Sequence, residues 1–135
     1  MPVVDASVVV DWLVPDADRA GLALPASASR AEARLLAPPL LAQEVGNALL
    51  TGVRRDRWDG LEADTMFGLM CRLPVTVLHD SAHVARAWEL SRRYDEHPLY
   101  DMVYVALAER LGDTLVTADE VLLRRVGHLP YVAAP

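Results

Sequence analysis

Short apolar runs alternate along the chain with longer stretches in which apolar positions recur every three or four residues. The first pattern is typical of buried strands, and the second of amphipathic helices. The predicted strands are Val3–Val4, Leu35–Ala37, Val75–Leu78, Thr114–Thr117 and Leu129–Val132. The predicted helices are Ala6–Leu13, Leu40–Arg54, Leu61–Leu73, a segment from Asp80 or Ser81 to about Arg93, Leu99–Leu111 and Asp119–Val126, with a weaker helical region at Asp16–Arg34.

This alternation predicts an α/β fold with a largely parallel sheet and helices on both of its faces. Internal repeats, low-complexity tracts and long linkers are absent from the sequence, so we expect one domain over residues 1–135. In open parallel sheets, ligands bind beyond the carboxyl ends of the strands. Polar residues that follow the predicted strands are therefore the first candidates for a functional site.

The composition is that of an ordinary globular domain, with 53% hydrophobic and 24% charged residues. No apolar stretch approaches the ~20 residues of a membrane span, and no basic segment of a signal peptide precedes the first apolar run. The single cysteine, Cys71, excludes an internal disulfide framework and is typical of a protein of the reducing cytoplasm. We expect Cys71 to be a small buried thiol.

The net charge of −6 argues against broad electrostatic capture of nucleic acid. That argument weakens if several of the acids form a pocket whose bound cations reverse the local charge. All 13 basic residues are arginine, which suits phosphate binding but also follows from a GC-rich genome. The densest basic cluster, Arg54, Arg55 and Arg57, is either a solvated helix end or a surface for RNA or a partner.

Two candidate acids follow predicted strands directly. Asp5 ends the run Val3–Val4, and Asp119 follows Thr114–Thr117, so a parallel sheet brings both to one edge. Each aspartate also precedes a predicted helix, where capping alone would explain it at about 1 kcal/mol. Capping and function remain open for both at this point.

Two further acids lie in predicted helices that are strongly apolar. Glu44 shares the apolar side of its helix with Leu41 and Val45, and an unpaired buried carboxylate there would cost several kcal/mol. It needs a metal, a hydrogen-bond network or a buried arginine partner. Asp101 opens the apolar run Met102–Ala108, where the helix dipole offers an alternative explanation at roughly 0.3–1 kcal/mol.

Several other site types find no support in the sequence. The four histidines show no zinc-ligand spacing with one another or with Cys71, and no glycine-rich phosphate loop is present. No serine lies in a nucleophile elbow. The segment Asp5-Ala6-Ser7 lacks the second acid, two residues on, that a phosphoryl-aspartate hydrolase requires. An acidic pocket for a divalent cation is the interpretation that remains.

Taken together, the local sequences around the four acids resemble the motifs of PIN-domain ribonucleases. A helix motif of that family, Glu-x-x-Asn-x-Leu, is similar to the residues from Glu44 to Leu49. The matching segments, in order along the chain, are Val4–Ser7, Glu44–Leu49, Tyr100–Glu109 and Leu115–Asp119. A short chain with these motifs looks most like the VapC toxins of bacterial toxin–antitoxin pairs.

This resemblance implies a PIN-like three-layer α/β/α fold with a central, mainly parallel five-stranded sheet. It implies a metal-dependent endoribonuclease that hydrolyses RNA with Mg²⁺ or Mn²⁺ and that forms a homodimer. It also implies a type II toxin, neutralised by a small cognate antitoxin similar to VapB. Two other functions remain open on the sequence: an RNA-processing PIN nuclease without a toxin role, and a non-catalytic PIN module that binds a protein.

The resemblance also implies roles for individual residues. Asp5 and Asp101 are expected as direct or water-bridged metal ligands, while Glu44 and Asp119 complete the site or position the attacking water. Three polar residues are expected to support these acids or contact substrate: Ser7, Asn47 and Thr117. Some family members carry a further acid shortly after the position of Asp119, where this chain has Leu122 and Leu123. The number of metal ions therefore stays open.

Overall fold

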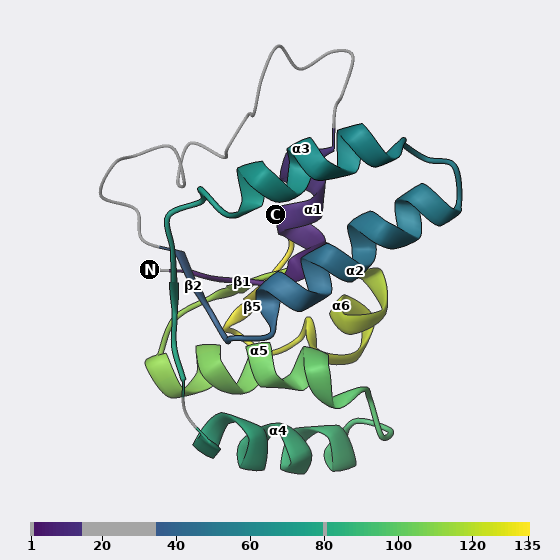
Figure 1. Cartoon of the computed structure of the whole chain (residues 1–135). Coiled ribbons are helices and arrows are strands. Elements are labelled where there is room, and N and C mark those ends of the chain that lie inside the picture. The colour runs from purple at the N-terminus through teal and green to yellow at the C-terminus, as the bar shows by residue number, and fades with distance from the viewer. Residues whose placement is uncertain (1, 15–34, 80) are drawn as a thin grey trace.

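A computed structural model describes residues 2–14, 35–79 and 81–135 (Figure 1). The weaker helical region predicted at Asp16–Arg34, and the possible cap Asp80, lie outside these residues. At the centre is a five-stranded sheet with the order β3-β2-β1-β4-β5, in which every neighbouring pair is parallel. Its strands are β1 (Val3–Val4), β2 (Leu35–Ala37), β3 (Val75–Val77), β4 (Leu115–Val116) and β5 (Val132–Ala133).

Six helices of the described chain cover the two faces of this sheet. They are α1 (Ala6–Leu13), α2 (Leu41–Arg54), α3 (Gly60–Met70), α4 (Ser81–Arg93), α5 (Leu99–Leu111) and α6 (Glu120–Val126). On one side α1, α2 and α3 pack against one another, and on the other α5 lies next to β1 with α4 outside it (Figure 1). The predicted three-layer α/β/α fold with a parallel sheet is confirmed.

The first strand of the chain is the middle strand of the sheet. Val3 pairs with Leu36 of β2 on one side and with Leu115 of β4 on the other, and Val4 pairs with Val116. Parallel strands buried on both faces are short and continuously apolar rather than alternating, as Val3 and Val4 are. Because β1 and β4 are neighbours and parallel, the residues after them meet at one edge.

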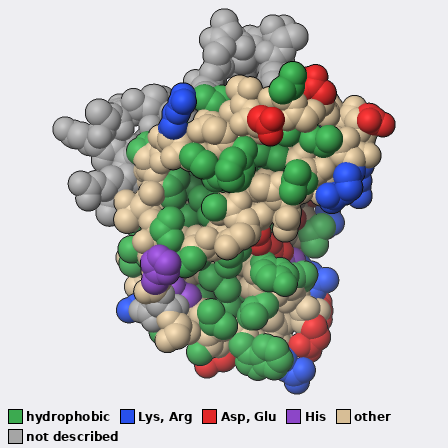
Figure 2. Space-filling model, in the orientation of Figure 1, with side chains coloured by type: hydrophobic (Ala, Val, Ile, Leu, Met, Phe, Trp, Pro, Cys, Tyr) green, Lys and Arg blue, Asp and Glu red, His purple; other side chains and the backbone are tan. Residues whose placement is uncertain are grey.

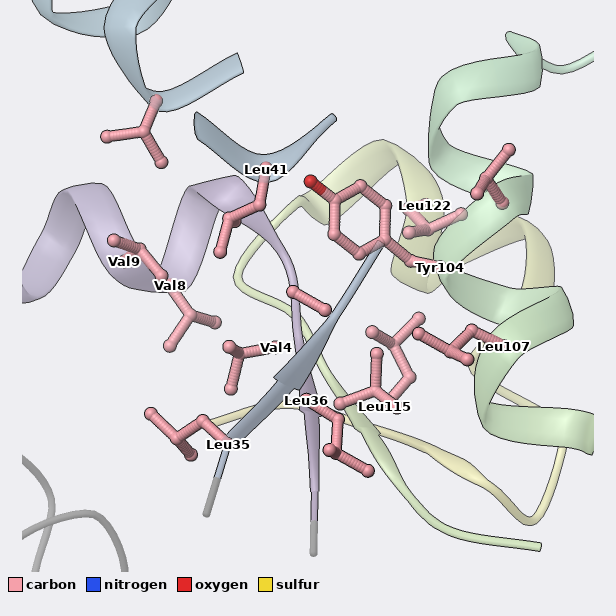
Figure 3. Packing of buried hydrophobic residues seen from close by; sticks show 14 of the residues in the cluster. Val4, Val8, Val9, Leu35, Leu36, Leu41, Tyr104, Leu107, Leu115 and Leu122 are labelled. Atoms are coloured by element: carbon pink, nitrogen blue, oxygen red, sulfur yellow. The ribbon is translucent and has the colours of Figure 1, made fainter. Parts of the chain in front are cut away.

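Helix α5 is central to the core, as its apolar sequence predicts. Its residues from Met102 to Ala108 are all buried, and Tyr104 and Leu107 belong to the same hydrophobic cluster as Leu115 of β4 (Figure 3). Gly112 ends the helix with φ +64°, a left-handed conformation that glycine adopts without a steric penalty. Such a buried, well-terminated helix holds its first turn in a fixed position.

Most elements differ from the sequence-based expectations by a residue or two at their ends, and three differences are informative. The last strand is Val132–Ala133 rather than Leu129–Val132, because the Val132 N–H donates to the Leu129 carbonyl across a turn. Helix α3 begins at Gly60, capped by Asp59, and ends at Met70. The expectation of a buried Cys71 is wrong, since this residue lies just after α3 and is exposed. No helix of the described chain is long and apolar enough to cross a membrane.

Candidate active site

Asp5 follows β1 and caps α1 with the same side chain. Its Oδ1 accepts hydrogen bonds from the Val8 backbone N–H at 3.3 Å and from Ser7 Oγ at 2.5 Å. Its Oδ2 accepts a short hydrogen bond from Thr117 Oγ1, on the far side of the β1–β4 pair. Asp5 is only 5% exposed. Capping therefore occupies one oxygen of this buried carboxylate, and the two explanations for Asp5 do not exclude each other.

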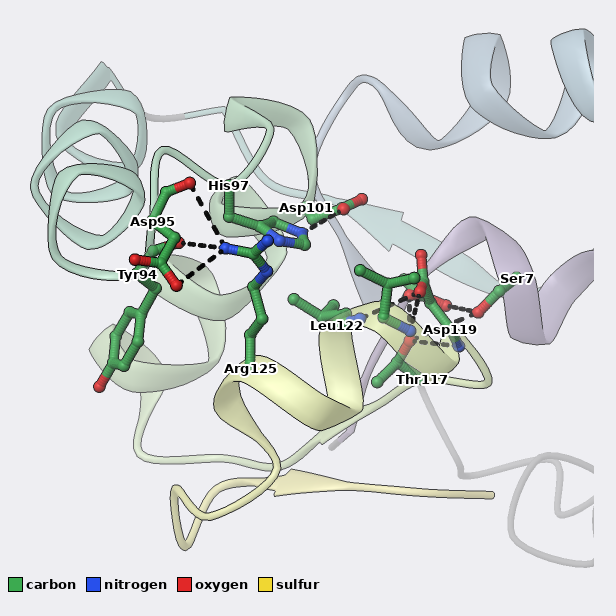
Figure 4. Close-up of polar contacts among 11 residues, drawn as sticks. Ser7, Tyr94, Asp95, His97, Asp101, Thr117, Asp119, Leu122 and Arg125 are labelled. Atoms are coloured by element: carbon green, nitrogen blue, oxygen red, sulfur yellow. Dashed lines mark hydrogen bonds and ion pairs between the residues drawn. The ribbon is translucent and has the colours of Figure 1, made fainter.

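Asp119 lies beside Asp5 because β4 lies beside β1. Its backbone N–H donates to Thr117 Oγ1 at 3.1 Å, and this threonine hydroxyl in turn donates to Asp5 (Figure 4). Ser7 Oγ, which donates to Asp5, also accepts from the Ala118 N–H at 2.9 Å. The two carboxyl ends are thus joined by a network of hydroxyl groups, with Thr117 fully buried at its centre.

The side chain of Asp119 caps α6. Its Oδ1 accepts from the backbone N–H groups of Val121 and Leu122, at 2.8 and 3.0 Å. As at Asp5, capping uses one carboxylate oxygen, because Oδ1 accepts both of these hydrogen bonds. The other oxygen keeps its capacity to accept a hydrogen bond or bind a cation.

Glu44 lies in the first turn of α2, next to the buried Leu41 and Val45, and is half-buried. Its partner in the described chain is not an arginine, because its Oε2 accepts a hydrogen bond from Tyr104 Oη at 2.8 Å. Burial raises the pKa of Glu44 to about 7; the Tyr104 bond lowers this pKa, while Asp101 and Asp5 raise it. This carboxyl group therefore keeps its proton to a higher pH than an ordinary glutamate.

Asp101 lies in the first turn of α5, one turn before Tyr104. Its Oδ2 is 2.6 Å from Nε2 of His97, whose ring is buried. Burial raises the pKa of Asp101 above its ordinary value, contact with His97 lowers it, and the charge of Asp119 raises it. Burial likewise raises the pKa of Asp5, against the hydrogen bonds from Ser7 and Thr117.

The four acids influence one another across the site. Asp101 raises the pKa of both Asp5 and Glu44, Asp5 raises that of Glu44, and Asp119 raises that of Asp101. The fold thus brings all four into electrostatic contact at the edge where β1 and β4 end. Among residues 2–14, 35–79 and 81–135, however, no three acidic, histidine or cysteine side chains close on a single point in the way a metal ion requires. The acids surround a shared region rather than a preformed cage.

The donors of this region suit a hard divalent cation. Carboxylate oxygens are the ligands that Mg²⁺ and Mn²⁺ prefer, and Mg²⁺ keeps several waters, so it needs only one or two carboxylates. Burial is the largest cause of the raised pKa of Asp5, Glu44 and Asp101, and a neighbouring acid adds to each, so negative charge is poorly stabilised here. A bound cation would supply that missing positive charge, so the residues present fit the ion that the sequence predicts.

Two polar contacts of the site were missed by sequence reasoning. The apolar pattern of its helix gives no sign that the Tyr104 hydroxyl donates to Glu44; burial raises the pKa of that hydroxyl, so it remains a donor. His97 has no zinc-ligand spacing in the sequence, yet its ring contacts Asp101. The only signal in the sequence is their spacing around Asp101, four residues before and three after. The predicted Asn47 lies on α2, one turn after Glu44, and is exposed.

Comparison with known proteins gives a consistent result. The family model for the PIN domain matches residues 3–129. The chain is 37% identical over 122 residues to "Ribonuclease VapC3" of Mycobacterium tuberculosis, covering 90% of this chain and 85% of that protein. It is 34% identical over 119 residues to "VapC ribonuclease Mb0985" of Mycobacterium bovis, covering 88% of this chain and 86% of that protein. The family predicted from the four motifs is confirmed: the chain belongs to the PIN-domain family and, within it, to the VapC ribonucleases.

Proposed function

We propose that this chain is a metal-dependent endoribonuclease that hydrolyses RNA phosphodiester bonds and acts as the toxin of a bacterial type II toxin–antitoxin pair. The observation that carries the proposal is the gathering of four acids at one edge of the sheet, where burial first, and neighbouring acids in addition, raise the pKa of Asp5, Glu44 and Asp101. Evenly spread surface acids do not influence one another in this way. Membership of the VapC ribonucleases supports the substrate class.

Asp5 and Asp101 are the residues that would hold Mg²⁺ or Mn²⁺ in this proposal. When bound, the ion supplies Lewis-acid activation of water and neutralises charge on the phosphate. Ser7 and Thr117 orient Asp5 through hydrogen bonds to both of its oxygens. Asp5 lies at the end of a strand and Asp101 in a buried helix, and both elements are rigid parts of the fold.

Glu44 is the candidate for positioning the attacking water and accepting its proton. A general base works best with a pKa near the working pH, and that of Glu44 is raised to about 7. The Tyr104 hydroxyl occupies Oε2 and fixes the carboxyl group, so Oε1 is the oxygen left for the water. Asp119 completes the acidic edge beside Asp101, and the exposed Asn47 is placed to contact RNA near Glu44.

The partners in this proposal are an RNA substrate, a VapB-like antitoxin and a second copy of the chain. Figure 2 shows apolar side chains spread over the face that α2, α3, α4 and α5 form. Exposed members of this kind include Leu61, Phe67, Trp88 and Tyr100, at 78, 45, 62 and 67% exposure. Large apolar side chains exposed to this degree support a protein–protein contact site. The single-domain organisation and the cytoplasmic location remain predictions.

The direct test is RNA cleavage by the purified chain with Mg²⁺, with Mn²⁺ and with EDTA. We expect cleavage only with metal, and a loss of at least ~100-fold in Asp101→Asn, which keeps the shape but removes the charge. Asp64→Asn, an exposed acid on α3, is the matched control and is expected to cleave normally. Cleavage by Asp101→Asn at the rate of the parent chain would remove this residue from the site.

A second experiment separates the toxin from an RNA-processing nuclease. The chain is expressed in bacteria with and without the product of the neighbouring upstream reading frame, and cleaved RNAs are mapped after induction. A toxin arrests growth and cleaves specific RNAs only when the neighbour is absent. Cleavage without growth arrest would favour the RNA-processing function, and arrest without cleavage would contradict the nuclease proposal.

A further inference from the structure

The turn between α4 and α5 presents His97 to the acidic edge. His97 precedes α5 by two residues, and its Nε2 lies 2.6 Å from Asp101 Oδ2. The residue is 3% exposed. A buried side chain cannot move without displacing its neighbours, so this contact is a fixed feature of the site. It occupies one oxygen of Asp101 and leaves the other, Oδ1, for a cation.

The surroundings of the ring indicate which nitrogen carries the proton. Nδ1 of His97 is buried and has no hydrogen-bond partner among the described residues. A buried N–H without an acceptor is costlier than an unused lone pair. A ring with its proton on Nε2 avoids that cost, because Nε2–H then donates to the Asp101 carboxylate and Nδ1 keeps only its lone pair.

The backbone of the turn is held in a conformation that its residues do not favour. Asp95 and Glu96 have φ of 55° and 54°, in the left-handed region that residues with a Cβ avoid. Such strain persists only where surrounding contacts enforce it. The His97 backbone N–H donates to the Tyr94 carbonyl at 3.1 Å, which closes the turn.

Arg125, in the last turn of α6, provides the enforcing contact. Its Nη1 donates to the carbonyl oxygens of Tyr94 and Asp95, at 3.0 and 3.4 Å, as Figure 4 shows. An ion pair with the exposed Asp95 carboxylate, at 3.5 Å, adds little by itself. Asp119 caps the other end of this helix, so α6 connects one acid of the site to the turn that supports another.

We propose that His97 is a positioning residue for Asp101, and that Arg125 holds the turn which places it. His97 donates from Nε2–H to Oδ2 and thereby sets the orientation in which Oδ1 binds a divalent cation. This inference rests on the proposed metal-dependent function and adds two residues to it. Hydrogen-bond partners of metal-binding carboxylates typically change metal affinity by roughly 10- to 100-fold when removed.

The test measures Mn²⁺ affinity of the RNA-free protein, by electron paramagnetic resonance of the free ion. His97→Gln retains a donor near the position of Nε2, and His97→Leu fills similar space without one. We expect Leu to weaken Mn²⁺ binding roughly 10- to 100-fold, and Gln to recover most of that loss. Equal affinities in Leu and the parent chain, or equal losses in Leu and Gln, would overturn the proposal.

The arginine offers an independent comparison should His97→Leu not fold. Arg125→Met removes the contacts to the turn, while Arg124→Met removes the same charge from an exposed neighbour on α6. We expect weaker Mn²⁺ binding only in Arg125→Met. A lower melting temperature with unchanged Mn²⁺ affinity would show a purely structural role and contradict the proposal.

Asp101→Asn separates this inference from the proposed function. If the parent chain binds Mn²⁺ and Asp101→Asn does not, unchanged binding in the His97 and Arg125 variants refutes the positioning role alone. If the parent chain itself does not bind Mn²⁺, both the metal-dependent function and the positioning role fall.

Discussion

Replacing Glu44 by glutamine should stabilise the metal-free protein at alkaline pH. The glutamine has nearly the same shape, and its Oε1 can still accept the Tyr104 hydrogen bond. What it removes is a negative charge held next to Asp5 and Asp101 in a partly buried position. The cost of holding that charge is visible in the raised pKa of Glu44.

The magnitude follows from the difference between folded and unfolded states. The pKa of Glu44 rises from 4.5 to about 7 on folding. At about 1.4 kcal/mol per pH unit this corresponds to roughly 3 kcal/mol. Glu44 is only half-buried, so solvent screening reduces the expected value to about 1–2 kcal/mol. For a chain of this size the gain corresponds to a rise in melting temperature of about 3–8 °C.

The sign of the pH dependence provides the sharper test. Because the folded pKa is the higher one, the folded state binds more protons between pH 4.5 and about 7, and stability falls as pH rises through this window. Urea unfolding in EDTA at several pH values from 4 to 8 should show this fall in the parent chain and a smaller one in Glu44→Gln. The exposed Glu120→Gln is the control for loss of one charge. A variant that is less stable than the parent at pH 8, or that keeps the full slope, would refute the reasoning.

Two further predictions concern the packing around the site and beside it. Thr117→Val should lower the free energy of unfolding in urea by ~1–3 kcal/mol, because the Asp119 N–H loses its acceptor and Asp5 loses a donor. Thr117→Ser should retain both hydrogen bonds. Equal losses of stability in the two variants would contradict this prediction. Gly52→Ala should cost roughly 1–3 kcal/mol despite the helix preference of alanine, because its Cβ would lie 2.0 Å from Cζ2 of the buried Trp58. Gly68→Ala, at a position of α3 with open space around it, should instead stabilise the protein by up to ~1 kcal/mol. A loss of stability in Gly68→Ala would count against the argument.

Much of the fold follows from the sequence because its signals are local. The bounds of α5 are those predicted, since its apolar run ends at Gly112, where the left-handed turn requires glycine. The last strand is displaced because Leu129 is apolar but belongs to a turn that packs on the core. Apolar character alone does not distinguish a packed turn from a strand. The exposure of Cys71 has a similar explanation, because a small apolar residue just after a helix can be either buried or exposed.

The sequence predicts which acids the fold brings to one edge, but not the contacts that they make. The strand ends place Asp5 and Asp119 together by topology alone, and both cap a helix through one carboxylate oxygen, which does not exclude a further role. Tyr104 is 60 residues from Glu44 along the chain, so their hydrogen bond depends on how α2 and α5 are placed. Pairings of this kind follow from tertiary packing, which no local pattern encodes.

The central place of β1 in the sheet has a consequence during synthesis of the chain. Thr117 and Asp5, which hydrogen bond directly, are 112 residues apart. At 5–20 residues per second, a ribosome needs roughly 6–22 s to make the segment between them. Until β4 emerges, β1 lacks one of its two neighbours, and the acidic edge is incomplete. The acidic edge therefore cannot form before the segment that holds Thr117 has been synthesised.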